Sequence, residues 1–162
     1  MKTPNHKMRF NLDGLKALKE ALPTDDIVKV GVLRSDNSRE DEDGGVLGNA
    51  EVGLIQEIGS ISRNIPARSW LRMPIETRQK ELIKFMQSPK AQGLAEDLQF
   101  EKLLQLLGIK AEAIIHEAFQ TGGFGKWPAN APATIAAKGS SKPLIDTRQL
   151  DTAVSSEVAK DV

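Results

Sequence analysis

Apolar residues recur at helical spacing in several stretches of the chain. In residues 11–22 the leucines are three or four positions apart, and Pro23 follows them. This spacing puts apolar side chains on one face of a helix, which a proline then ends, so a helix is predicted there. A second helix is predicted over residues 49–59, with Asn49 as its N-cap and Gly59 as its terminator.

Two longer helical patterns occupy the middle of the chain. The first begins with Pro74 in its first turn and runs to residue 87, where the sequence SPKAQG is expected to break it. The second begins at Phe100 and runs to a pair of glycines at 122 and 123. Its apolar stripe is broad, which is typical of a central helix that packs on more than one neighbour.

Alternation with a period of two predicts two strands. Residues 27–33, IVKVGVL, are the best strand in the sequence, and residues 152–158 are a second, short strand. A short helix is expected at residues 131–139, a flexible start at 1–10 and a frayed end at 159–162.

These elements predict one α+β domain over residues 1–162. Its small, mainly antiparallel sheet packs against the long central helix, and helical and loop segments are inserted between them.

Three stretches are irregular. Residues 34–48 are polar and strongly acidic, which indicates either a solvated, mobile loop or a loop that becomes ordered against a basic partner. Residues 60–74 carry Trp70 and other apolar residues through a segment with two prolines. Residues 138–150, KGSSKPLIDTRQL, read as a polar loop followed by a helix start, with Asp146 as the capping residue.

Composition limits the classes of function. The 162 residues include 22 Lys and Arg, 22 Asp and Glu, and no cysteine. A zero formal charge argues against a general attraction to nucleic acid, and the lack of cysteine excludes disulfides, thiolate catalysis and cysteine-ligated metals. No signal peptide or membrane span is apparent, so we expect a soluble chain made in the cytoplasm.

The sequence does not match the catalytic patterns that its residues first suggest. His116 has no second histidine four residues on, so the metalloprotease pattern fails and a partly buried structural role is expected. The stretch TGGFGKWP fails the phosphate-loop pattern, because Gln120 and Trp127 stand where a glycine and a serine or threonine are needed. No enzyme activity, cofactor or metal site is predicted.

Three arginines lie close to a tryptophan in the irregular segment. Arg63, Arg68 and Arg72 surround Trp70, which is compatible with a nucleic-acid patch that has a stacking aromatic. The zero net charge favours a protein–protein contact instead, because Trp and Arg are common interface anchors.

Two phrases, in this order, resemble tailed-phage virion-morphogenesis proteins that complete the tail or join head to tail. The family pattern Ala-Glu-x-Gly, then Ile-Pro-x-Arg-x-aromatic-Leu-Arg, is matched at Ala50, Glu51, Gly53, Gly59, Ile65, Pro66, Arg68, Trp70, Leu71 and Arg72. The later pattern is matched at Trp127, Pro128, Asn130, Thr134, Lys138, Gly139, Pro143, Leu144, Ile145, Asp146, Thr147 and Leu150. The resemblance spans about residues 27–158. Where the family usually has Gly after Asp-Thr, this chain has Arg148; if that Gly is needed for a positive φ, either Arg148 is strained or the turn differs.

The resemblance implies a non-enzymatic structural component of the virion. It implies a homo-oligomeric ring at the neck or tail end that contacts adjacent connector or tail-tube proteins and lets DNA pass. The candidate assembly residues are Arg68, Trp70, Leu71, Arg72, Trp127 and Leu144, and the structural motif residues are Pro66, Pro143, Ile145, Asp146, Thr147 and Leu150. Trp70 and Leu71 are expected to be buried or interfacial, and Arg68 and Arg72 to bridge carboxylates. The alternatives are a transient assembly factor and a small nucleic-acid-binding protein.

Overall fold

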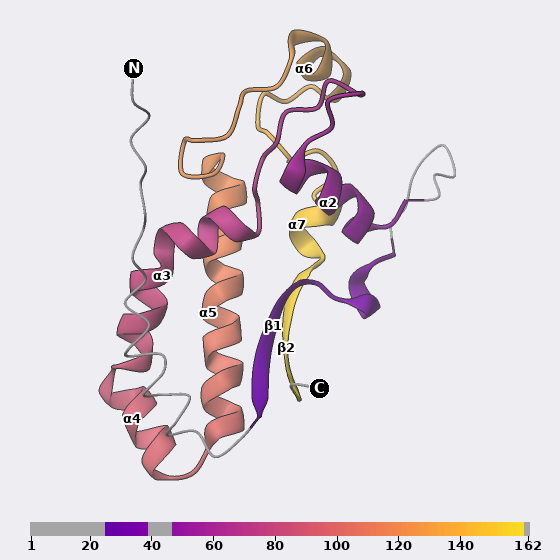
Figure 1. Ribbon diagram of the computed structural model, residues 1–162. Helices are drawn as coiled ribbons and strands as arrows, with labels where there is room; N and C mark the ends of the chain where they lie inside the picture. Colours follow the sequence, from indigo (N-terminus) through magenta and orange to yellow (C-terminus); the bar gives the residue numbers. More distant parts are fainter. Residues whose placement is uncertain (1–24, 39–46, 161–162) are drawn as a thin grey trace, which may run out of the picture.

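Six α-helices, a 3-10 helix and two strands follow one another in the described part of the chain (Figure 1). The structure is a computed structural model that describes residues 25–38 and 47–160. The elements are β1 (Asp26–Val32), η1 (Arg34–Asp36), α2 (Asn49–Ile58), α3 (Arg72–Met86), α4 (Pro89–Glu96), α5 (Phe100–Thr121), α6 (Pro132–Lys138), α7 (Gln149–Thr152) and β2 (Val154–Lys160). The predicted helix 11–22 and flexible start 1–10 lie outside the described residues.

The two strands pair antiparallel and bring the two ends of the described chain together. Val28 lies opposite Val158, and Val32 lies opposite Val154. Both predicted strands are confirmed, the second shifted by two residues towards the C-terminus. The fraying expected from residue 159 is wrong for Ala159 and Lys160, because both pair with β1. Residues 161–162 lie outside the described ranges.

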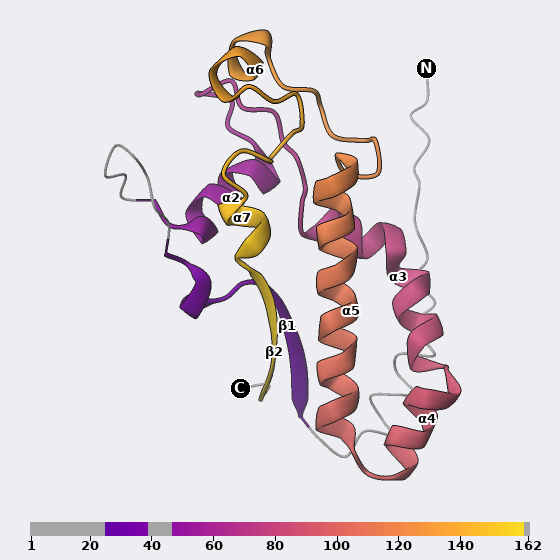
Figure 2. The same cartoon turned by 180° about the vertical axis from the view of Figure 1, so that it is seen from behind.

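The long helix α5 lies at the centre of the fold. Figures 1 and 2 show β1 and β2 on one side of it, and α3 with α4 on the other. Residues facing these neighbours are buried: Leu103, Leu104, Gly108, Ala111, Ile114, Ile115, Ala118 and Phe119. At Gly108 a Cβ would collide with the Ser156 side chain, so glycine permits the close approach of helix and sheet. The predicted α+β fold, with a small antiparallel sheet against a long helix, is confirmed.

An aromatic cluster closes the core at the C-terminal end of α5. The Phe119 ring lies 5.8 Å from the Trp70 ring and 5.7 Å from the Trp127 ring, measured between centroids. Leu150 and Val154 complete this buried cluster, which therefore joins the irregular segment 60–71 to both ends of the later motif.

The N-terminus of α2 is capped from another segment. Gly48 occupies the N-cap position, so the predicted cap at Asn49 is wrong. The Asn37 side chain accepts a hydrogen bond from the Ala50 amide at 2.7 Å, while buried Asn49 donates to the Ser38 carbonyl at 2.8 Å. The terminator Gly59 is confirmed, with φ of 75°.

These bonds also hold the start of the predicted acidic loop. Residues 34–36 form η1, and Ser155 of β2 donates to the Asp36 carboxylate at 2.6 Å. The stretch 34–38 is thus attached to α2 and β2. Residues 39–46 lie outside the described part of the chain.

The helix predicted over residues 74–87 is confirmed as α3, with Pro74 in its first turn. A break follows as expected, but SPKAQG is part of a further helix, α4, and is not a loop. Ser88 caps α4 by accepting a bond from the Ala91 amide at 3.3 Å. None of the helices within residues 25–38 and 47–160 is both long and apolar enough to cross a membrane.

Candidate functional site

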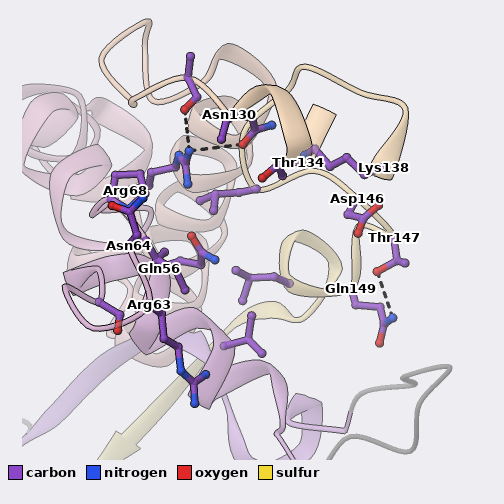
Figure 3. Close-up of a pocket in the computed structure, with 18 of the residues that line it drawn as sticks. Gln56, Arg63, Asn64, Arg68, Asn130, Thr134, Lys138, Asp146, Thr147 and Gln149 are labelled. Carbon is purple, nitrogen blue, oxygen red and sulfur yellow. Dashed lines mark hydrogen bonds between the residues drawn. The ribbon is translucent and has the colours of Figure 1, made fainter. Parts of the chain in front are cut away.

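A cavity of about 830 Å³ lies between α2, the turn at residues 60–66, α6 and the segment 144–150 (Figure 3). Residues of both matched phrases line it: Ile65, Pro66, Arg68, Asn130, Thr134, Lys138, Leu144, Asp146, Thr147 and Leu150. The fold therefore brings together two phrases that are separated in the sequence by residues 73–126.

Arg68 joins the two phrases through main-chain carbonyls. Its Nε donates to the Pro128 carbonyl at 2.9 Å, and its Nη2 donates to the Ala129 carbonyl at 3.0 Å. A longer bond of 3.4 Å reaches Asn130 Oδ1. The side chain is buried, and this burial lowers the pKa of Arg68. The predicted bridge from Arg68 to a carboxylate is wrong, because the planar guanidinium serves instead as a multiple donor to an irregular loop.

Arg72 behaves as predicted. It forms an exposed ion pair with Glu76, one helical turn on, at 3.6 Å. Arg63 is exposed and points away from Arg68 (Figure 3). Trp70 is only 4% exposed, whereas a stacking platform for bases needs an accessible ring. The three arginines therefore do not surround an exposed aromatic.

The Trp70 segment is held by Glu57 of α2. The Glu57 carboxylate accepts from Ser69 Oγ at 2.6 Å and from the Leu71 amide at 2.9 Å. Ser69 Oγ in turn accepts from the Met73 amide at 2.9 Å, inside the first turn of α3. A carboxylate at this end of a helix is favoured by free amides and by the helix dipole. Sequence reasoning missed Glu57 and Ser69, because no local pattern marks an acid that acts on another element.

The candidate assembly residues are mostly buried within the chain itself. The Trp70 indole donates to the Gly53 carbonyl at 2.8 Å, and the Trp127 indole donates to the Ser69 carbonyl at 3.0 Å. Leu71 and Leu144 are partly buried against the same core. The expectation that Trp70 is buried is confirmed, and the two indoles have little surface left for another subunit.

The segment around Pro143 is held by two side chains. Lys138 Nζ donates to the carbonyls of Lys142 at 2.5 Å and Ile145 at 2.7 Å. The Asn130 amide donates to the carbonyls of Ser141 and Lys142, each at 3.2 Å. Burial lowers the pKa of Lys138, an effect that the nearby Asp146 carboxylate opposes. The bend of this segment is thus tied to α6 and to the loop that Arg68 holds.

The backbone of the later motif is strained at two places. Leu144 has φ of 58° and Arg148 has φ of 63°, both in the left-handed region that non-glycine residues avoid. Arg148 occupies the N-cap position of α7, and no side chain caps that helix, so the predicted cap at Asp146 is wrong. Of the two alternatives left open for Arg148, the structure shows the strained one, because this residue has a positive φ.

Two polar groups nearby bear on what this region can do chemically. Half-buried His116 of α5 contacts buried Asp151 of α7 through Nδ1 at 2.8 Å. Its partial burial is as expected, and the contact also links α5 to α7. Within the described ranges, no three His, Asp or Glu side chains are grouped closely enough to hold a metal ion.

Gln56 of α2 lines the cavity, but its Oε1 atom is buried and finds no donor among residues 25–38 and 47–160. Leaving such an acceptor unsatisfied costs about 1–3 kcal/mol.

No family model matches the chain, and no curated protein or solved structure matches it either. The functional conclusion therefore depends on the two phrases and on the geometry that they adopt.

Proposed function

We propose that this chain is a structural virion component that completes the tail or joins head to tail, assembling as a ring at the neck through which DNA passes. The observation that carries this proposal is the convergence of the two matched phrases on one cavity, where Arg68, Asn130 and Lys138 hold their loops together. If the two phrases resembled the family only by chance, there would be no reason for residues so far apart in the sequence to line one cavity.

The strained backbone gives further support. Left-handed residues other than glycine are maintained where the surrounding structure determines them, and they gather at binding and switch regions. Leu144 and Arg148 both line the cavity. The second of them stands where the resembled family usually has glycine, which needs no strain in that conformation.

An exposed apolar row on α2 and the turn that follows it is suited to contact between subunits. Leu54 and Ile58 lie one helical turn apart on α2 and are 59% and 68% exposed. Ile61, in the turn that follows, is fully exposed and also lines the cavity. In a head-to-tail ring each subunit presents two different surfaces, and this exposed row supplies one of them.

The test compares two substitutions, each of which changes an exposed apolar residue to aspartate. Each variant is produced in the host during infection by the phage, in place of the original chain. Ile58→Asp is expected to lower the titre of infectious particles at least tenfold and to leave unjoined heads and tails in electron micrographs. Leu98→Asp, at a residue that is 74% exposed but remote from the cavity, is the control and should leave the titre within twofold. Equal titres for both variants, with the purified variants folded, would exclude the row from assembly.

A further inference from the structure

A second cavity is apolar and lies between β1, α3 and α5. It has a volume of about 300 Å³. Its walls include Val28 and Val30 of the strand and a row along α3 made of Ile75, Leu82, Ile83 and Met86. With Gln79, which also lines the groove, these α3 positions follow one another at steps of four, three, one and three residues, so they form one face of the helix, about 17 Å long from Ile75 to Met86.

We propose that residues 11–22 form an amphipathic helix that docks into this groove of its own chain. Their leucines, at positions 12, 15, 18 and 22, fall within an arc of about 120° when each residue turns by about 100°. From Leu12 to Leu22 such a helix is about 15 Å long, close to the length of the α3 row. The apolar stripe and the groove therefore match in length and in chemistry.

The connection favours docking within one chain. Only Pro23, Thr24 and Asp25 separate Leu22 from β1, and this stretch spans at most about 14 Å. The groove begins at Val28, two residues into β1. A tether this short gives a local concentration in the millimolar range, which a second copy does not reach in dilute solution.

The chain has no cysteine, so an engineered pair reports proximity without interference. Gln79 lies in the wall of the groove, and Leu15 is in the middle of the leucine stripe. The full-length double variant Leu15→Cys/Gln79→Cys is oxidised at low concentration, and the disulfide is located by non-reducing electrophoresis and peptide mass spectrometry.

Two control pairs change one partner each. Glu20→Cys/Gln79→Cys moves the thiol to the polar face of the segment, and Leu15→Cys/Thr77→Cys moves the other thiol to an exposed position on α3. If the helix docks in the groove, the Leu15→Cys/Gln79→Cys pair should form a disulfide within the monomer at least tenfold faster than either control pair. Equal rates in the three pairs would overturn the proposal, and so would a disulfide that joins two chains.

A second measurement uses no cross-link. Leu15→Asp/Leu18→Asp should expose the groove and raise the fluorescence of a bound hydrophobic dye several-fold, while Asp13→Lys/Glu20→Lys should leave it unchanged. Equal fluorescence in the two variants would contradict docking through the leucines.

Discussion

Arg68 and Arg72 stand four residues apart in one phrase and have opposite environments. Arg68 is buried and donates to carbonyls of the loop 128–130, whereas Arg72 is exposed and pairs with Glu76. Lysine keeps the charge of arginine but lacks its planar set of donors. The same substitution should therefore have different consequences at the two positions.

Arg68→Lys is expected to lower the free energy of unfolding by about 2 kcal/mol, because hydrogen bonds from a charged donor to buried carbonyls are lost. Arg72→Lys should change it by at most about 0.5 kcal/mol, since exposed ion pairs contribute little. Urea denaturation of the two variants measures both values. Equal effects would mean that Arg68 does not hold the loop.

Arg148 offers a stabilising substitution. Its left-handed conformation costs an L-residue about 1 kcal/mol, which glycine avoids. Arg148→Gly should therefore have a free energy of unfolding about 1 kcal/mol higher than that of Arg148→Ala, and a higher melting temperature. The alanine variant is the matched control, because it also loses the contact of 3.9 Å with Asp151. A glycine variant no more stable than the alanine variant would exclude strain at this residue.

At this scale, the sequence predicted the pairing of Arg72 with a carboxylate and left open whether Arg148 is strained or the turn differs. It failed for Arg68 and Asp146 for a common reason. The partners of Arg68 are main-chain carbonyls, which every residue has, and the first turn of α7 uses no side-chain cap. Neither arrangement can therefore be recognised from the residue types in the sequence.

At the scale of elements, two helical glycines have opposite roles. A Cβ at Gly53 in α2 would lie 2.8 Å from the Trp70 ring, whereas a Cβ at Gly93 in α4 would meet nothing within 4 Å. Gly53 thus lets α2 approach the tryptophan, whose indole donates to the Gly53 carbonyl. Gly93 has no such contact.

Gly53→Ala is expected to lower the free energy of unfolding by about 2 kcal/mol through overpacking. Gly93→Ala should raise it by about 1 kcal/mol, because alanine favours a helix interior. Thermal unfolding followed by circular dichroism measures both changes. A loss of stability in both variants would contradict the roles assigned to the two glycines.

Periodicity predicted the elements that have a long apolar face or clear alternation. It recovered α5, α3 and both strands within a few residues. It missed α4, which is only eight residues long. The cap of α2 was misplaced because the capping side chain, Asn37, comes from a different segment and is placed by tertiary structure.

At the scale of the whole molecule, the central claim is that two distant phrases build one surface for assembly. The order of the phrases was visible in the sequence, but the cavity between them was not. The cavity depends on loops that are held by hydrogen bonds between side chains and the backbone. Glu57, Asn130 and Lys138 each bond to the backbone of a segment outside their own element or turn. The acceptor Gln56 Oε1 and the exposed row on α2 also became apparent only in the folded chain.

The most direct measurement is quantitative mass spectrometry of virions purified from a host that produces this chain. A retained neck or tail-completion ring predicts a small, constant number of copies in every mature particle, in fixed ratio to the other neck and tail-end proteins. Absence of the chain from mature particles, while it is abundant in the infected cell, would contradict a structural role and would favour a transient assembly factor.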